Sequence, residues 1–460
     1  MSQEFVSVDQ AVRDQIKNSL DDTLFVEAGA GTGKTSSLVD RVLGLVSAGR
    51  ATVDRIAVIT FTDSSAAELR DRIREALEKA ALEVRADGIE RDRCRQGVRD
   101  IDQASIQTVH SFATDLLQSK PLEAGLPPGF RVMDRVEADL SFEDHWQQWM
   151  DAALDDPETG QTFALAISLG MSISQMRGIA LDFHHEYDQL DGVVFASLTD
   201  VQGKSIPALI QAAPVLDRLC QYARLGECDR LVRHVRGVLS WVKRLREIEP
   251  SSPPAYQLLK QAGQIRFSKG RQSDWDLDPE TGVNACALLK DRLGDLNEVV
   301  RTDLAEARRV ALGALLTALK GFSLEYAVER KSQGTPQFHD LLVWTRDLIR
   351  DVRAVRDHFR NRFVYLLIDE VQDIDPIQAE IALLLSQTSD SWTWCNQDKD
   401  GLQVESGRMF AVGDPKQSIY RFRRADINQV RRLQTAMGSS PVRLLQNYRT
   451  QKPIIDWVNH

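Results

Sequence analysis

The chain has 460 residues, and its shares of 43% apolar and 27% charged residues are ordinary for a globular protein, so we expect two or three domains. The sequence opens without a basic, apolar leader, which argues against secretion, and it has no apolar stretch long enough to span a bilayer. Its five cysteines are scattered without a C-x-x-C pair, which argues against a metal site built on cysteines. Together these features favour a cytoplasmic protein. The net charge of −10 excludes general affinity for nucleic acid but is compatible with a local basic groove.

The stretch TLFVEAGAGTGKT, residues 23–35, indicates a strand, a turn of small residues and a helix. Such a turn lets backbone N–H groups surround a phosphate, and the helix adds its positive dipole end. Lys34 would reach the β- and γ-phosphates, and the Thr35 hydroxyl would hold Mg²⁺. A strict P-loop has glycine where Ala28 stands, but the flanking elements agree with the motif. The predicted nucleotide-binding residues are Ala28, Gly29, Ala30, Gly31, Thr32, Gly33, Lys34 and Thr35.

Two further segments follow the same order of strand, loop and helix. Residues 55–62 (RIAVITFT) predict a buried strand, and a helical stripe follows it; residues 105–112 resemble a third strand edge that ends near His110. This succession is typical of a parallel α/β sheet, whose ligands bind at the carboxyl ends of the strands. Thr60, Phe61 and Thr62 therefore lie at a functional edge.

Between residues 121 and 336 the sequence lacks β-branched runs and predicts amphipathic helices instead. Their pattern indicates an all-helical insertion within the α/β fold, without any definite signal of function. The expected helices are Ala138–Leu154, Ile206–Leu225, Asp229–Ile248, Ala285–Leu296 and Asp303–Lys331.

An acidic pair follows the apolar strand predicted at residues 363–368. Asp369 would hold Mg²⁺ and Glu370 would orient the attacking water. Two carboxylates after a strand are often only a polar strand end, but the P-loop in the same chain favours the catalytic interpretation. A further strand at 409–413 leads into 414–424, where aromatic residues alternate with Lys and Arg, as suits stacking on bases and pairing with phosphates.

Six blocks of the sequence follow one another along the chain: AGAGTGKT (28–35), TFTDSSAAELRDRI (60–73), TVHSF (108–112), LIDEVQD (367–373), VGDPKQSIYRFRRAD (412–426) and LLQNYRT (444–450). In content and order they resemble the motifs of the Rep/UvrD group of superfamily 1 DNA helicases. Within that group, GDPKQSIYRFR and FHDLL (338–342) are similar to the RecB/AddA-like branch.

The resemblance implies an α/β fold, a RecA-like P-loop parallel sheet flanked by helices, with a large all-helical insertion domain. We expect the RecA-like ATP-binding domain in two parts, 1–120 and 337–440, with the helical accessory insertion at 121–336. Residues 441–460 would begin an incomplete second RecA-like domain, so we expect the chain to be the N-terminal part of such a protein.

The resemblance also implies an ATP-driven motor that uses Mg²⁺ and moves 3′ to 5′ along single-stranded DNA, opens duplex junctions in repair or recombination, and works with a nuclease or helicase partner subunit. Gln10, or Gln15 since the offset is loose, would contact the adenine edge, and Tyr448 would stack on adenine. The catalytic set would be Lys34, Asp369, Glu370, Gln417 as γ-phosphate sensor and Arg449 as arginine finger, with Thr35 and Asp369 at the metal. The single strand would meet Thr60, Phe61, Thr62, His110, Tyr420 and Phe422.

Two alternatives stay open at this point. The chain could be a nucleotide-binding accessory module that binds DNA without unwinding it, or the same motor could act on RNA.

Overall fold

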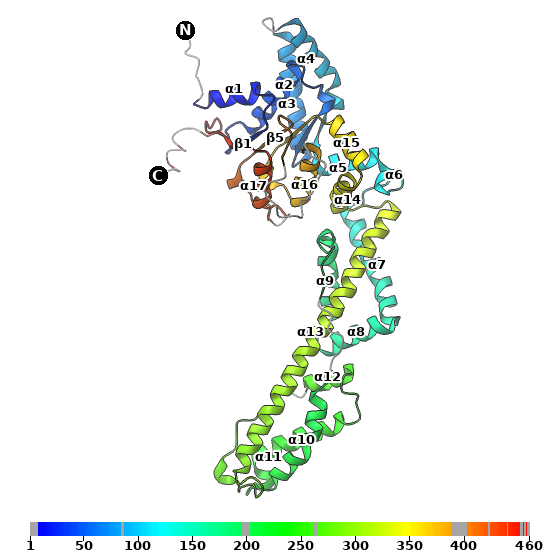
Figure 1. Ribbon diagram of the computed structural model, residues 1–460, viewed down its shortest axis with the longest axis vertical. Helices are drawn as coiled ribbons and strands as arrows, with labels where there is room; N and C mark the ends of the chain where they lie inside the picture. The colour runs from blue at the N-terminus through cyan, green and yellow to red at the C-terminus, as the bar shows by residue number, and fades with distance from the viewer. Residues whose placement is uncertain are drawn as a thin grey trace. The chain divides into compact units, whose positions relative to one another are not determined.

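The computed structural model describes residues 8–83, 87–195, 203–261, 265–387, 403–421, 424–438, 440–450, 454 and 457. The chain divides into two compact units (Figure 1). Unit 1 comprises Met1–Met133 and Arg330–His460, and unit 2 comprises Asp134–Glu329. Unit 2 therefore lies within the range 121–336 expected for the helical insertion.

Unit 1 is built on one six-stranded sheet with the order β3-β2-β4-β5-β1-β6, in which every pair of neighbours is parallel. Because all strands run the same way, their carboxyl ends meet at one edge of the sheet. The predicted α/β fold with a parallel sheet is confirmed. The strands are β1 (Leu24–Ala28), β2 (Ile56–Thr60), β3 (Ser105–Thr108), β4 (Tyr365–Ile368), β5 (Met409–Gly413) and β6 (Val442–Leu444).

Helices cover both faces of this sheet. Side chains alternate between the two faces along each strand, and apolar residues on both faces therefore pack against helices. Leu24, Val26 and Ala28 of β1 share a core with α2, α3 and α4. Ile59 and Ile368 are not in that core and instead line a small cavity with residues of α5 and α16. The helices of unit 1 are α1 (Gln10–Asn18), α2 (Lys34–Ser47), α3 (Asp63–Leu82), α4 (Gly88–Asp100), α5 (Val109–Ser119), α6 (Pro121–Ala124), α14 (Phe338–Asp351), α15 (Arg353–Arg362), α16 (Pro376–Ser386) and α17 (Ile427–Ala436).

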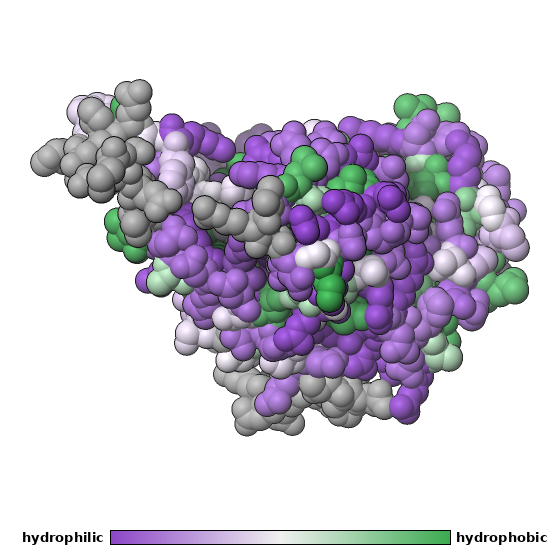
Figure 2. Space-filling view, turned by 90° about the horizontal axis from the view of Figure 1, so that it is seen from above, coloured by the Kyte–Doolittle hydropathy of each residue, from purple (hydrophilic) through white to green (hydrophobic). Residues whose placement is uncertain are grey.

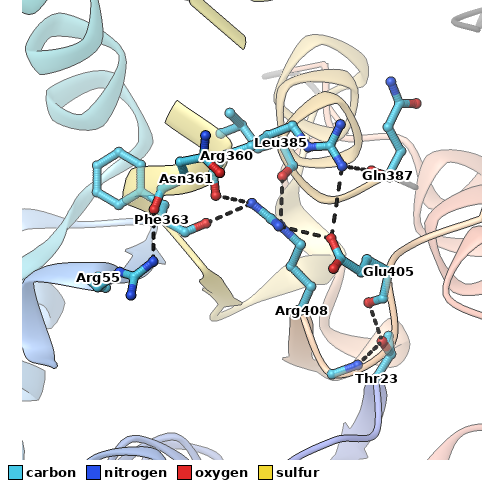
Figure 3. A network of polar contacts seen from close by, with 10 residues as sticks. Thr23, Arg55, Arg360, Asn361, Phe363, Leu385, Gln387, Glu405 and Arg408 are labelled. Atoms are coloured by element: carbon cyan, nitrogen blue, oxygen red, sulfur yellow. Dashed lines mark hydrogen bonds and ion pairs between the residues drawn. The ribbon is translucent and has the colours of Figure 1, made fainter. Parts of the chain in front are cut away.

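At the start of β5, Arg408 joins several element ends (Figure 3). Its Nε donates to the carbonyl of Leu385 at 3.0 Å and its Nη2 to the carbonyl of Phe363 at 3.1 Å. Nη2 also donates to the carbonyl of Arg360, and Nη1 pairs with Glu405 at 2.9 Å. One guanidinium thus satisfies carbonyls at the ends of α15 and α16 that lack helical partners. The contacts hold the amino edge of the sheet, opposite the candidate site.

The regular secondary structure of unit 2, over its described residues, is helical apart from isolated bridges, and the unit has its own apolar core. Trp146 and Trp275 are buried in that core. The helices are α7 (Arg135–Asp155), α8 (Pro157–Ser168), α9 (Ile173–His185), α10 (Ser205–Cys220), α11 (Arg230–Leu245), α12 (Pro253–Gln261) and α13 (Ala285–Gln333), which continues into unit 1.

Helix α13 corrects two expectations from the sequence. Residues 285–296 and 303–331 were expected as separate helices, but 49 residues form one helix. Asp303, where the second helix was expected to begin, is 3% exposed and accepts hydrogen bonds from the backbone N (2.9 Å) and the hydroxyl of Ser205. By length and composition α13 also contains a window that could cross a bilayer, contrary to the expectation that no stretch could. Half of that window is buried, and a buried core helix meets the same criterion.

The face of the molecule seen in Figure 2 is mainly hydrophilic, and apolar residues lie on it singly or in small groups. Isolated apolar residues on a surface are normal and indicate no binding site by themselves. The side chains singled out by the sequence lie instead at the carboxyl edge of the sheet.

Candidate nucleotide and nucleic-acid site

The glycine-rich loop connects the end of β1 to Lys34, the first residue of α2. Gly31 and Gly33 have φ of 76° and 91°, in the left-handed region that favours glycine. At Gly31 space is also limiting, since a Cβ there would lie 2.7 Å from Cβ of Arg449 and 2.8 Å from Oδ1 of Asn447. The loop therefore has the conformation and the close approach that a phosphate-binding turn requires.

Lys34 meets the acidic pair at this edge. Its Nζ lies 2.5 Å from Oε2 of Glu370, a residue 336 positions away in the sequence. Glu370 follows β4 with φ of 49°, an uncommon conformation for a residue with a side chain. Its backbone N donates to Oδ1 of Asp369 at 3.0 Å. The structure thus brings three predicted catalytic residues together in unit 1.

The carboxylates here are crowded and partly dehydrated. Burial, and after it the neighbouring charge of Glu370, raise the pKa of Asp369 to about 6. Burial and Glu370 likewise raise the pKa of Asp373 to about 6. Within the described part of the chain, no three His, Cys, Asp or Glu side chains could enclose a metal ion. Mg²⁺ typically takes one or two carboxylates and completes its shell with phosphate and water, and Thr35 and Asp369 are the residues that would hold it.

Gln372 bridges the acidic pair and the loop after β5. Its side chain is 2% exposed; Nε2 donates to Oε2 of Glu370 at 2.8 Å, and Oε1 accepts from the backbone N of Asp414 at 2.9 Å. Gln417 continues the chain of contacts, because its Nε2 donates to Oδ2 of Asp414 at 2.7 Å. The proposed γ-phosphate sensor is therefore linked to Glu370 through two side chains.

Residues 447–449 lie against the glycine-rich loop. The backbone N of Tyr448 donates to the carbonyl of Gly31 at 2.8 Å, and Nδ2 of Asn447 donates to the carbonyl of Ala30 at 3.0 Å. The Tyr448 side chain is 56% exposed. Tyr448 and Arg449 thus lie beside the glycine-rich loop, as the resemblance implies.

Helix α1 presents a different residue to this loop from the one named in the sequence analysis. Gln10 and Gln15 are exposed, and Nε2 of Gln10 donates to Oδ1 of Asp14 at 3.0 Å. Arg13 instead donates from Nη2 to the carbonyl of Thr32 at 2.8 Å.

The residues expected to contact single-stranded DNA lie at the same carboxyl edge of the sheet. Phe61 and Tyr420 pack with ring centres 4.8 Å apart and planes tilted by 35°, and His110 meets Phe338 edge-on at 5.6 Å. Thr60 is 3% exposed as a whole residue, which does not fit the expected contact with single-stranded DNA, and the Thr62 hydroxyl caps α3 by accepting from the backbone N of Ser65. Phe422 lies outside the described residues.

Four side chains of this site were not singled out from the sequence. Asp9 and Arg13 form an i,i+4 pair at the start of α1, a spacing that can be read from the sequence. Gln372 lies within the block LIDEVQD and Phe338 within FHDLL. Both blocks were recognised in the sequence, but no role was assigned to these two residues. Phe338 is 59% exposed and would extend the aromatic surface at His110.

A glycine-rich loop at a helix N-terminus, with its lysine beside an acidic pair on a neighbouring parallel strand, defines a P-loop nucleoside-triphosphate-binding protein. The family described as UvrD/REP helicase N-terminal domain matches residues 9–222 and 270–437, and the chain belongs to this family.

Curated relatives are named as one of the subunits of an ATP-dependent helicase/nuclease. The chain is 24% identical to the protein of Clostridium perfringens, 25% to that of Geobacillus kaustophilus and 26% to that of Exiguobacterium sibiricum. Each comparison covers 95% of this chain but 37% to 38% of the relative. The chain therefore spans a little over a third of the length of these relatives.

Proposed function

We propose that this chain is the ATP-binding part of a DNA helicase motor that couples ATP hydrolysis to 3′–5′ movement on single-stranded DNA in repair or recombination. The observation that carries the proposal is the 2.5 Å contact between Lys34 and Glu370 at the carboxyl edge of a parallel sheet. The family match supports the motor class. The names of the relatives support a partner subunit with nuclease or helicase activity.

Bound MgATP supplies the phosphoryl group that is transferred to water. Lys34 and the loop N–H groups would bind the phosphates, and Thr35 and Asp369 would hold the cation. Glu370 would orient water and accept its proton, held in place by Gln372. Gln417 and Arg449 would respond to the charge that develops at the γ-phosphate.

Phe61, Tyr420, His110 and Phe338 would bind bases by stacking, a mode that tolerates any sequence. The links from Glu370 through Gln372 and Asp414 to Gln417 lead to the loop that carries Tyr420. This route would couple the state of the nucleotide to the grip on DNA.

The test measures MgATP binding and phosphate release by the chain, with and without single-stranded DNA. Lys34→Ala should abolish MgATP binding, because the phosphates lose the positively charged lysine side chain. Glu370→Gln should keep binding within about three-fold and lower turnover at least about 100-fold, because the amide cannot accept a proton. Lys79→Ala, an exposed lysine in the last turn of α3, is the matched control and should change neither quantity.

The nucleic-acid arm compares fluorescence anisotropy of matched DNA and RNA single strands. Phe61→Ala should weaken DNA binding about ten-fold, the order expected for loss of one stacked base. DNA binding that never stimulates phosphate release would contradict the motor and favour an accessory module. Tighter binding and stronger stimulation by RNA would reassign the substrate.

A further inference from the structure

Thr60, the last residue of β2, carries a buried hydroxyl that no described residue satisfies. The residue is 3% exposed, and its Oγ1 has no hydrogen-bond partner within the described part of the chain. Its neighbour in β3 is Thr108, whose hydroxyl is already used, because it accepts from the backbone N of Ser111 and caps α5. A buried hydroxyl without a partner is costly, so such a group usually faces a bound water, an ion or a ligand.

The neighbour of Thr60 on the other side is Asp369. Ile59 of β2 is the register partner of Ile368 of β4, and the backbone N of Asp369 continues the ladder by donating to the carbonyl of Ile59 at 2.8 Å. One residue further along these parallel strands, Thr60 and Asp369 therefore stand side by side. Neighbouring strands lie about 4.8 Å apart, a spacing that one hydrogen bond or one bridging water between two side chains can span.

The alternation of side chains shows which face these two residues share. Val58 and Leu367, each two positions earlier on its strand, belong to the apolar core that includes residues of α2. Side chains two positions apart on a strand point to the same face, so Thr60 and Asp369 face the side of the sheet that α2 covers. Helix α2 opens with the residues proposed to hold the phosphates and the cation. The unsatisfied hydroxyl is therefore directed to the proposed metal site.

The carboxylate of Asp369 can use such a donor. Its Oδ1 accepts from the backbone N of Glu370 at 3.0 Å, whereas no residue in the described ranges donates to its Oδ2. A carboxylate that binds a metal is normally itself held by hydrogen bonds, which fix its orientation. A threonine hydroxyl has one proton to donate, and that of Thr60 is not committed elsewhere.

We propose that, when MgATP is bound, the Thr60 hydroxyl donates to the Asp369 carboxylate, directly or through one water, and fixes its orientation toward the divalent cation. Thr60 is then a positioning residue of the metal site, and Phe61, the next residue, is the one that meets single-stranded DNA. This inference rests on the proposed function, because it assumes that the phosphates bind at Lys34 and the cation at Asp369.

The experiment is calorimetric titration of the chain with adenylyl imidodiphosphate, an ATP analogue that is not hydrolysed, in Mg²⁺ and separately in EDTA. Thr60→Val keeps the shape of threonine without its hydroxyl. It should weaken binding in Mg²⁺ about ten-fold, because the metal carboxylate loses its orienting contact, and leave binding in EDTA within about three-fold of wild type. Thr60→Ser keeps the hydroxyl and should restore binding in Mg²⁺ to within about three-fold of wild type.

Two further variants separate this role from a general effect of the substitution. Asp369→Ala removes the carboxylate, so adding Thr60→Val to it should cause little further loss of affinity in Mg²⁺. Thr345→Val is the matched control: it removes another buried threonine hydroxyl of unit 1, which donates to the carbonyl of Ala113 at 3.2 Å. It should change binding neither in Mg²⁺ nor in EDTA.

The DNA arm distinguishes the metal site from the DNA path. Thr60→Val should bind single-stranded DNA within about three-fold of wild type, whereas Phe61→Ala loses about ten-fold. Weaker DNA binding by Thr60→Val with unchanged affinity in Mg²⁺ would overturn the inference and return Thr60 to the DNA path.

Two other outcomes would also overturn the inference. An equal loss of affinity in Mg²⁺ and in EDTA would place Thr60 in the packing of the phosphate loop. A Thr60→Ser chain with the circular dichroism spectrum of wild type that binds in Mg²⁺ no better than Thr60→Val would show that the hydroxyl is not the group that matters. Absence of any Lys34-dependent binding in wild type would instead overturn the proposed function, and this inference with it.

Discussion

Arg330 and Asp340 form a fully buried ion pair in unit 1, and each side chain is 1% exposed. Two hydrogen bonds of 2.8 Å join the guanidinium to the carboxylate, and the backbone N of Gln337 donates to the same carboxylate at 2.8 Å. Removing one partner would leave a buried charge with most of its compensation gone. Replacing both with apolar residues would remove that charge altogether.

We expect Arg330→Met to lower the free energy of unfolding by about 3 to 5 kcal/mol, and Arg330→Met with Asp340→Leu to recover much of the loss. Urea unfolding followed by circular dichroism measures both. Arg301→Met, which breaks an exposed pair, should change the free energy of unfolding by less than about 0.5 kcal/mol. A single variant that unfolds like wild type would show that the pair is not buried as described.

At the scale of elements, the end of β5 must lie very close to the residues that follow the acidic pair. A Cβ on Gly413 would lie 2.4 Å from Oε1 of Gln372 and 3.0 Å from the backbone N of Val371. The absence of a side chain at Gly413 is therefore what permits the bridge from Glu370 through Gln372 to Asp414.

Gly413→Ala should displace the Gln372 amide and lower DNA-stimulated phosphate release at least about ten-fold, because Glu370 loses a positioning contact. Nucleotide affinity should stay within about three-fold, since the phosphate loop is on a different strand. Gly237→Ala on α11 is the matched control: its Cβ would meet nothing within 4 Å, and it should raise stability by about 0.5 to 1 kcal/mol. Equal turnover in the two variants would remove Gln372 from the mechanism.

Local patterns predicted the elements of unit 1 well, because each strand carries its own signal. The run RIAVITFT gave β2, and 409–413 was expected with the bounds that β5 has. The P-loop and the acidic pair were also predicted from local sequence. Small residues indicate the tight turn of the P-loop, and the end of an apolar strand locates the acidic pair. The family of the chain was also predicted and is confirmed.

Long-range contacts left no such signal. Nothing near Asp9 indicates that its carboxylate binds amides of residues 445 and 446, so the contact of Arg13 with the glycine-rich loop was not foreseen. The helix start expected at residue 303 was wrong for the same reason, because the Ser205 partner of the buried Asp303 carboxylate is distant in sequence. The assigned roles of Gln417, Arg449 and the DNA-facing residues remain predictions.

At the scale of the whole molecule, each unit has its own apolar core. Leu77 in the core of unit 1 and Leu289 in the core of unit 2 are both 0% exposed. Units with separate cores can unfold in separate steps.

Calorimetry should therefore show two unfolding transitions. Leu77→Ala and Leu289→Ala should each cost about 2 to 5 kcal/mol and lower the midpoint of a different transition. If both variants shifted one common transition, the units would form a single cooperative structure.

The order of strands in the sheet has a consequence for biosynthesis. The P-loop is complete at Thr35, but β5, the neighbour of β1 in the sheet, begins at Met409, and unit 2 is encoded between them. At ribosomal rates of about 5 to 20 residues per second, the first strand waits roughly 20 to 75 seconds for that partner. During this interval unit 2 can fold alone while both edges of β1 lack their neighbouring strands, β5 and β6. We expect the nascent chain to depend on chaperones most strongly before residue 409 leaves the ribosome.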